Sequence, residues 1–470
     1  MNSTAAEISF RDKVSTVDKA GKRVWVYPKK PKGKFTNWRM VVNAIFLTIL
    51  FTGPFIRING LPLLMLNVVE RKFVIFGQIF WPQDFYIFVV ATLAAVVGIA
   101  LFTVVYGRVF CGWICPQTVF MEGVFRPIEY WIEGDWTAQK KLDKQEWNRE
   151  KVLKKGSKHF IFFLISFIIA NTFLAYIIGS EALIGIITDP PAVHIAGLIS
   201  ILLFTGAFYW VFAFFREQVC TTVCPYGRLQ GVLLDRESVV VTYDYKRGEN
   251  RGKIRRGEDR AAAAKGDCVD CSLCVNVCPT GIDIRNGTQL ECINCTACID
   301  ACDSIMANVG LPKGLIRYDS EANVAEGKKG FRWTSRSIAF TAILVGICSL
   351  LAFLLFVRPQ VDATVLRTPG MMYQEQPDGS FSNLYNFKII NKTDQEMELS
   401  LRMESDKGEV KIVGKERALI LPRQGVAEGA LFLMLHKEEL QGISQELEIG
   451  IYHNGKLLKT VDTKFIGPAL

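Results

Sequence analysis

The sequence predicts a multi-domain membrane protein. We expect an α-helical transmembrane bundle of about five spans, an inserted cysteine-rich α+β domain and a C-terminal all-β, immunoglobulin-like sandwich. Three observations lead to this fold class. Several windows of about twenty residues carry no charge, which is long enough to cross a bilayer. Eight of the thirteen cysteines fall within one short stretch, and the cysteine-free segment 359–470 alternates apolar and polar residues.

The charge distribution points to a membrane and not to a nucleic acid. Half of the 470 residues are hydrophobic and the formal net charge is +9. The basic residues crowd beside the apolar windows, as the positive-inside rule predicts for a membrane protein. We therefore expect a membrane as partner and no nucleic acid. Residues 1–37 are expected to form a basic cytoplasmic arm.

The transmembrane region is expected at 38–215, with one further span after the cysteine-rich stretch. The predicted spans are 40–56, 85–107, 159–178, 192–215 and 337–357. Segment 216–336 carries eighteen Lys or Arg residues and should lie inside, so five crossings place 359–470 outside. Residues 60–83 are apolar but broken by charges and prolines, which predicts an interfacial or re-entrant loop.

Two C-x3-C-P motifs, at 111–116 and 220–225, each end an apolar span and each follow an arginine. Thiols four apart share one face of a helix, and the proline disfavours helix for the residue before it. The two pairs are candidates for one cytoplasm-facing site, which suits Cu(I), zinc or iron–sulfur better than a hard cation. The alternative is that these cysteines are small buried residues at helix ends. The candidate ligands are Cys111, Cys115, Cys220 and Cys224.

The densest signal is a doubled C-x2-C-x2-C-x3-C run. In this spacing the first three cysteines of a run bind one [4Fe–4S] cluster and the fourth ligates the other cluster. We predict a two-cluster ferredoxin domain at 259–310. Zinc is a weaker alternative because it favours paired C-x2-C modules with longer gaps, and disulfides do not persist in a reducing compartment. The predicted ligand sets are Cys268, Cys271, Cys274 and Cys302 for one cluster, and Cys292, Cys295, Cys298 and Cys278 for the other.

The segment 359–470 reads as short strands. Residues 384–401 alternate on either side of a turn at 391–394, and residues 446–465 alternate around Asn454-Gly455. Asn-Gly strongly favours a two-residue hairpin turn. We interpret both stretches as hairpins of an antiparallel sandwich like an immunoglobulin domain.

Five further residues are weaker candidates. His159 lies at the inner end of a predicted span, and a solvated side chain is a simpler interpretation of it than a metal ligand. Packing is the simpler role for His194 and Cys348, and Met371-Met372 make only a weak case for copper.

Taken together, the two C-x3-C-P motifs (CGWICP and CTTVCP), the doubled ferredoxin run and the β-rich tail resemble the cytochrome c oxidase accessory proteins of the CcoG (FixG/RdxA) family. The resemblance covers nearly the whole chain. It implies a membrane-bound polyferredoxin of the bacterial inner membrane, with two [4Fe–4S] clusters in the cytoplasm and residues 359–470 in the periplasm. It also implies a cupric reductase that supplies Cu(I) for assembly of the cbb3-type oxidase, with copper at the C-x3-C-P cysteines. The chain departs from the symmetric ferredoxin pattern in having Asp303 where a second proline could follow Cys302.

The expected partners are cbb3-type oxidase subunits or copper-delivery proteins and a cytoplasmic electron donor of unknown identity, and a homodimer is left open. Two other functions remain open at this point. One is an electron relay between the quinone pool and another membrane redox complex. The other is an assembly scaffold whose β-domain binds oxidase subunits.

Overall fold

The structure is a computed structural model that describes residues 16–468, apart from 19, 59, 69–71, 256–259, 261, 329, 331, 394, 406–407 and 415–418. Residues 1–15 of the expected basic arm lie outside the described residues. The chain divides into two compact units, described separately below. One comprises residues 1–56 and 90–349, and the other comprises residues 57–89 and 350–470.

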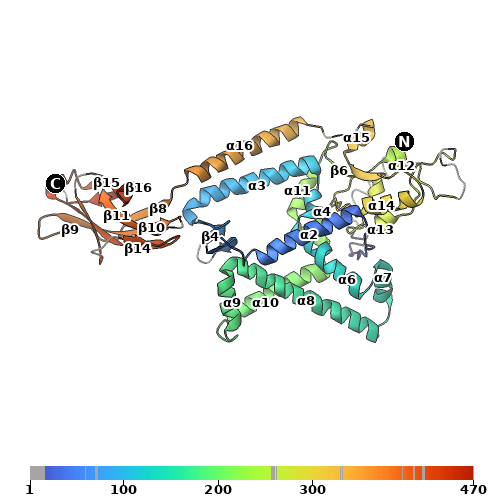
Figure 1. Cartoon of the computed structure of the whole chain (residues 1–470), viewed down its shortest axis with the longest axis horizontal. Helices are drawn as coiled ribbons and strands as arrows, with labels where there is room; N and C mark the ends of the chain where they lie inside the picture. Colours follow the sequence, from blue (N-terminus) through green and yellow to red (C-terminus); the bar gives the residue numbers. More distant parts are fainter. Residues whose placement is uncertain are drawn as a thin grey trace. The chain divides into compact units, whose positions relative to one another are not determined.

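Five helices in the described chain are long and apolar enough to cross a membrane (Figure 1). Few of their side chains are covered by protein, and in the last of them Phe356 is 91% exposed. Apolar surface on this scale is unfavourable in water, and a lipid environment removes that penalty. The helices therefore indicate a membrane protein. They are α2 (Lys34–Thr52), α3 (Phe85–Tyr106), α8 (Arg149–Ile178), α10 (Ile195–Trp210) and α16 (Ser335–Val357).

Two of these helices extend well beyond the predicted spans. Helix α2 begins at Lys34, where 40 was predicted, and ends at Thr52, before Pro54. Helix α8 begins at Arg149, where 159 was predicted, because Asn148 caps it and accepts a hydrogen bond from the Lys151 amide at 2.8 Å. Hydrophobicity marks the apolar part of a helix, whereas caps and prolines set its ends.

The helix is interrupted before the proline of each C-x3-C-P motif, as predicted, and short helices lie on both sides of the break. In both motifs the amide of the second cysteine donates to the carbonyl five residues earlier, from Cys115 to Phe110 at 2.9 Å and from Cys224 to Val219 at 2.8 Å. The following proline starts a new helix with the cysteine as its N-cap. The elements are α4 (Val109–Trp113), α5 (Pro116–Phe120), η2 (Met121–Phe125), α6 (Arg126–Ile132), α7 (Trp136–Lys144), η3 (Val211–Phe215), η4 (Val219–Val223) and α11 (Pro225–Leu233).

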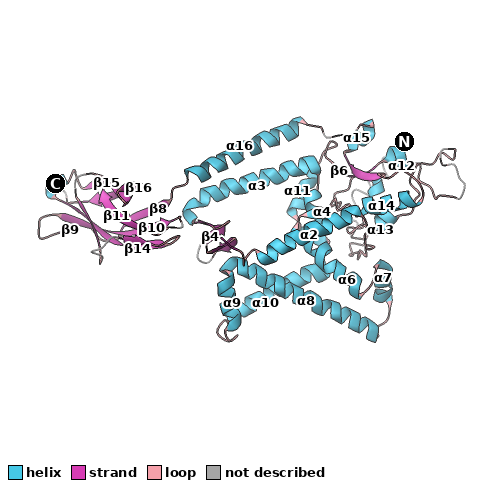
Figure 2. Ribbon diagram, in the orientation of Figure 1, coloured by secondary structure: helices cyan, strands magenta, loops and turns pink. Residues whose placement is uncertain are grey.

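The cysteine-rich stretch forms a small α+β segment. Strands β6 (Val240–Tyr243) and β7 (Ile316–Asp319) pair antiparallel, and two helices each begin just after the second cysteine of a run (Figure 2). A buried apolar cluster that includes Val241, Ile299 and Leu315 fixes the helices against the strand pair. The remaining elements are α12 (Tyr245–Gly248), α13 (Leu273–Asn276), η5 (Ile284–Asn286), α14 (Ala297–Asn308) and α15 (Glu321–Glu326).

The C-terminal part is a sandwich of two antiparallel sheets. One sheet has the order β12-β14-β10-β8 with β9 beside β10, and the other has the order β13-β11-β15-β16. Inward-facing side chains of both sheets form one core, with Tyr385, Leu431 and Ile449 fully buried. The strands are β8 (Val361–Arg367), β9 (Gln374–Glu375), β10 (Phe381–Asn391), β11 (Met397–Met403), β12 (Glu409–Ile412), β13 (Leu419–Leu421), β14 (Val426–Leu435), β15 (Ser444–His453) and β16 (Lys456–Ile466), with the short helix η6 (Lys437–Glu439) between β14 and β15.

One of the two predicted hairpins is present and the other is wrong. β15 and β16 pair directly, and Asn454 and Gly455 take the positive φ angles of 48° and 77° that a tight turn requires. The predicted turn at 391–394 includes residue 394, which lies outside the described residues. The chain passes from one sheet to the other between β10 and β11, because β10 pairs with β8 and β14 whereas β11 pairs with β13 and β15. Alternation shows which side chains face the core but not which strand is the neighbour.

The segment predicted as an interfacial or re-entrant loop is a small β-structure. Asp84 at its end is buried and pairs with Arg358 at 2.7 Å and with Lys392 at 2.6 Å, both in the same unit. This buried ion-pair network fastens the small sheet to the sandwich. The elements are β1 (Arg57–Ile58) paired with β2 (Leu61–Pro62), the meander β3 (Leu64–Asn67), β4 (Lys72–Ile75) and β5 (Gln78–Phe80), and η1 (Pro82–Asp84).

Candidate metal centres

The eight cysteines of the double run surround two small hollows. The first hollow has mainly apolar neighbours such as Tyr243, Met306 and Ile316. Among its thiols Cys271 is exposed, whereas Cys268 and Cys274 are buried. The cysteines that line it are Cys268, Cys271, Cys274 and Cys302.

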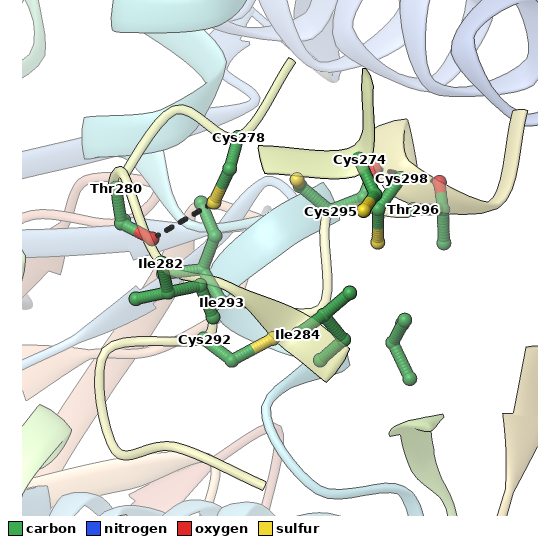
Figure 3. Close-up of a pocket in the computed structure, with 11 residues that line it drawn as sticks. Cys274, Cys278, Thr280, Ile282, Ile284, Cys292, Ile293, Cys295, Thr296 and Cys298 are labelled. Carbon is green, nitrogen blue, oxygen red and sulfur yellow. Dashed lines mark hydrogen bonds between the residues drawn. The ribbon is translucent and has the colours of Figure 1, made fainter. Parts of the chain in front are cut away.

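The second hollow is apolar as well, with Ile282, Ile284 and Ile293 in its wall (Figure 3). Cys278 reaches it from the far end of the first run, beside the Thr280 hydroxyl at 3.4 Å. Cys274, at the boundary of the two hollows, lines both. The other cysteines of this wall are Cys278, Cys292, Cys295 and Cys298.

This arrangement fits a cluster better than a single ion. Among the described residues, no three His, Cys, Asp or Glu side chains are placed to hold one metal ion. The sulfur atoms are instead grouped around hollows, with the fourth cysteine of each run in the wall of the other run's hollow. A [4Fe–4S] cubane needs four thiolates around a space of its own, with this crossed fourth ligand.

The loops that carry these cysteines repeat the same backbone conformation. Asp270 and Ser272 flank the second cysteine of the first run, with φ angles of 51° and 54°. Asn294 and Thr296 flank the second cysteine of the second run, with φ angles of 52° and 65°. Asp and Asn tolerate the left-handed region better than most residues. The repeat therefore extends from the cysteine spacing to the backbone that wraps each hollow.

Burial keeps these thiols protonated until a metal binds. Burial is the main cause that raises the pKa of Cys274, of Cys292 and of Cys302 to about 12, and neighbouring thiols add to the effect. A thiol is a metal ligand only as the thiolate, and the charge of bound iron supplies the stabilisation that deprotonation requires.

The structure brings the four C-x3-C-P cysteines together. Burial raises the pKa of Cys220 to about 12, and the negative charge of the three other thiols, Cys115, Cys111 and Cys224, raises it further. The pKa of Cys115 is likewise raised by burial and by Cys224. The two motifs therefore lie in one region, and we call their four cysteines the thiol cluster, although no three of these thiols are placed to hold a single metal ion as they stand. Cys220 lies in a π-helical turn, a feature frequent at functional sites.

Gln230 belongs to this thiol cluster, and the sequence alone did not single it out. Its Oε1 accepts hydrogen bonds from the Arg108 Nε at 2.8 Å and from the Cys111 Sγ at 3.2 Å. The Gln230 side chain is fully buried, on helix α11 after the second motif. A second arginine, Arg216, is bound elsewhere, with both guanidinium nitrogens on Glu129 at 2.8 and 2.9 Å. The two motifs are thus similar in backbone and different in their arginine contacts.

The thiol cluster adjoins the second hollow. Cys111 packs in one buried cluster with Ile293, Cys295 and Ala301. A Cβ atom at Gly112 would lie 2.4 Å from the Ile293 carbonyl oxygen, so the first motif and the Cys292–Cys295 segment touch through their backbones. Only a glycine allows this approach, and it places the C-x3-C-P site against one particular cluster-binding loop.

The weaker candidates take no part in this site. His159 Nδ1 lies 2.9 Å from the Tyr209 hydroxyl, and His194 pairs with Asp189 at 2.9 Å. Cys348 is exposed on the apolar helix α16, and Met371 and Met372 are exposed in the unit that contains the sandwich.

Comparison with known proteins agrees with this geometry. Residues 215–321 match the model of a 4Fe-4S dicluster domain, residues 88–139 match a 4Fe-4S binding domain, and residues 351–468 match the Ig-like fold at the C-terminus of FixG.

Three curated relatives span most of the chain. RdxB of Cereibacter sphaeroides is 34% identical over 400 residues, which cover 82% of this chain and 83% of RdxB. RdxA of the same organism is 33% identical, covering 88% of this chain and 89% of RdxA. The nitrogen fixation protein FixG of Rhizobium meliloti is 33% identical, covering 82% of this chain and 80% of FixG. The cysteine hollows, the apolar helices and these relatives lead to one conclusion: the chain belongs to the FixG/RdxA family and is an iron–sulfur electron-transfer protein.

Proposed function

We propose that this protein reduces Cu(II) to Cu(I) for the assembly of a cbb3-type cytochrome c oxidase. The observation that carries the proposal is the position of the four C-x3-C-P thiols, which lie together and against the Cys292–Cys295 loop. The C-x3-C-P thiols are soft ligands, and they lie next to the segment that carries the electron-transfer cysteines. Soft sulfur stabilises Cu(I) relative to Cu(II), so such a site favours the reduced product.

The eight cysteines around the two hollows are proposed to hold two [4Fe–4S] clusters, with the ligand sets that the spacing predicts. Bound there, the clusters supply one-electron transfer. Each Cu(II) takes up one electron, which a low-potential cytoplasmic donor must provide. No covalent bond of the chain is made or broken.

The chain's own residues prepare the thiol cluster for a soft metal. Burial keeps Cys220 protonated, so metal binding must release its proton. Gln230 fixes the Cys111 side chain through a hydrogen bond and at the same time satisfies the buried Arg108. Contacts of this kind orient metal ligands and tune the affinity of the site.

We further propose that the protein lies in the bacterial inner membrane. The excess of Lys and Arg in 216–336 supports a cytoplasmic position for the cluster-binding segment, and five crossings support a periplasmic position for 359–470. The proposed receivers of Cu(I) are oxidase subunits or copper-delivery proteins.

The experiment uses the anaerobically purified full chain with its clusters reduced and excess reductant removed. Added Cu(II) should be converted to Cu(I), detected with a Cu(I)-specific chelator, in the ratio of one Cu(I) per reduced cluster. Holoprotein with oxidised clusters serves as the control, and the reduced protein should form one additional Cu(I) for each cluster that is reoxidised. Reduced holoprotein that leaves Cu(II) unchanged would refute the proposal.

One finding favours a second function. The 4Fe-4S binding domain matched at 88–139 contains Cys111 and Cys115. If the C-x3-C-P thiols hold a further cluster, the protein is an electron relay between the quinone pool and another membrane redox complex. Iron analysis separates the two, since a further cluster requires more than about eight irons per chain.

A further inference from the structure

Arg39 connects a membrane helix to the second hollow. It lies on α2, is 3% exposed, and its Nη1 donates a hydrogen bond to the Cys295 carbonyl at 3.0 Å. Cys295 lines the second hollow. A buried guanidinium is therefore hydrogen-bonded to the backbone of one of the proposed cluster ligands. Neither the cysteine motifs nor the family matches assign Arg39 a role.

The start of α2 is fixed to the helix that carries the last two cysteines. Asp300 on α14 accepts hydrogen bonds from the Phe35 amide at 3.1 Å, the Thr36 amide at 2.7 Å and the Thr36 hydroxyl at 2.7 Å. Asp300 thereby satisfies amides at the N-terminus of α2 that have no partner within the helix. A Cβ atom at Gly33 would lie 2.3 Å from the Asp300 Cγ, so the approach requires glycine. This contact holds Arg39, on the next turn of α2, against Cys295.

The charge of Arg39 is only partly compensated. Its nearest carboxylate is Glu122, with Oε2 at 3.8 Å from Nη2, and Glu122 Oε1 lies 3.0 Å from the guanidinium of Arg126. One carboxylate therefore serves two buried arginines. Arg126 also pairs with Glu217 at 3.7 Å, and Glu217 pairs in turn with Arg23 at 3.3 Å and with Arg216 at 3.6 Å. Glu129 is a third acidic neighbour of Arg126 and binds Arg216 at 2.8 Å. Among the described residues, Arg39 therefore has no carboxylate to itself within ion-pair distance.

The first hollow has a different balance. The arginine in its wall is Arg285, which binds Asp283 at 2.7 Å and Asp270 at 2.6 Å. A second arginine, Arg260, donates from Nη2 to the Cys268 carbonyl at 3.1 Å. Two carboxylates balance these two guanidinium groups, and Arg260 is partly exposed whereas Arg39 is 3% exposed. Solvent screens a partly exposed charge more than a buried one. An iron–sulfur cluster gains one negative charge on reduction, and nearby positive charge stabilises the reduced form. The two hollows should therefore hold clusters of unequal reduction potential.

We propose that Arg39 raises the reduction potential of the cluster at the second hollow above that of its partner, and so makes it the cluster from which electrons leave toward Cys111. The first cluster, beside the exposed Cys271, then receives the electron from a low-potential one-electron donor. The order of the clusters in the electron path rests on the proposed function. The effect of Arg39 on the potential requires only that both clusters are present.

The test is a redox titration of the anaerobically purified full-length holoprotein, followed by EPR. Replacing Arg39 with Gln should lower one midpoint potential by at least about 59 mV, a tenfold change in a one-electron equilibrium, and leave the other in place. Arg39→Lys should restore most of the potential because it keeps the charge. Arg285→Gln is the matched control and should lower the other midpoint, since it leaves two carboxylates without their cation.

Iron content is measured in each variant to show that both clusters are present. If Arg39→Gln fails to assemble its clusters, Glu122→Gln tests the same proposal with opposite sign, because removing the shared carboxylate should raise the same midpoint. The proposal is overturned if both potentials stay unchanged in loaded Arg39→Gln and Glu122→Gln variants, or if the midpoint that Arg39 controls is the lower of the two. These potentials do not depend on copper, so a protein that shifts as expected but leaves Cu(II) unreduced would contradict the proposed function alone.

Discussion

Replacing Gln230 with Leu is a sharp test of the thiol cluster because Gln230 contacts the Cys111 thiol and the neighbouring Arg108 without being a metal ligand itself. Leucine has a similar size and no hydrogen-bonding atom. The change removes the acceptor of both the Arg108 Nε–H and the Cys111 thiol. Arg108 is itself buried, so its donor finds no ready replacement in water.

The structure sets the size of the expected effect. Leaving a buried donor without its partner costs about 1–3 kcal/mol, and more when the donor is charged. Loss of a contact that orients a metal ligand lowers metal affinity by roughly 10–100-fold. We therefore expect a folded protein with full iron content and a Cu(I) affinity lowered by that factor.

The assay is a competition for Cu(I) between the protein and a chelator of known affinity, under anaerobic conditions. Gln139→Leu is the control, since Gln139 on α7 is also buried but donates to the carbonyl of Gly134, in the turn just before that helix. Unchanged Cu(I) affinity in Gln230→Leu, with intact fold and iron, would refute the reasoning that these four thiols and Gln230 form one copper site.

Three further predictions follow from the same structure. The apparent Cu(I) affinity should rise with pH by up to about tenfold per pH unit for each proton released. The reason is that burial raises the pKa of Cys220 to about 12, and copper must displace that proton. A competition assay at several pH values measures this, and an affinity that does not change with pH would contradict it. Asp84→Ala should destabilise the unit containing the sandwich by about 3–5 kcal/mol, measured by denaturant titration, because it leaves Arg358 and Lys392 buried without their carboxylate. The exposed pair of Lys388 is the control, and Lys388→Ala should change the free energy of unfolding by less than about 1 kcal/mol. A reporter protein fused after residue 470 should behave as periplasmic, and cytoplasmic behaviour would overturn the proposed topology.

The cluster-binding cysteines could be grouped from sequence because the ligand geometry is local. The spacing C-x2-C-x2-C-x3-C already specifies which thiols can reach one cubane. In the structure four of these cysteines line the first hollow and five line the second, with Cys274 in both walls, so the assignment of ligands to each cluster stays a prediction. The five apolar helices could also be predicted from the sequence, since length and lack of charge are properties of a single segment.

Contacts between distant segments could not be predicted in this way. Gln230 is an ordinary polar residue until α11 places it beside Cys111, and Asp300 looks like a solvent-facing acid until it caps α2. The pairing of β10 with β14, in place of β11, likewise depends on the whole sandwich and not on the turn at 391–394. Glycines such as Gly112 carry no side chain to signal the close backbone approach that requires them.

The central claim is that the C-x3-C-P thiols bind copper while the other eight cysteines bind iron, and metal analysis of two variants tests it most directly. Replacing Cys111, Cys115, Cys220 and Cys224 with Ser exchanges soft sulfur for a hard hydroxyl of nearly the same size, so copper should be lost while about eight irons per chain remain. Replacing Cys268 and Cys292 with Ser should do the reverse, with iron lost and Cu(I) supplied in reduced form still bound. Loss of iron together with copper in the first variant would show that the membrane-edge thiols hold a cluster, and retention of copper there would show that the copper site lies elsewhere.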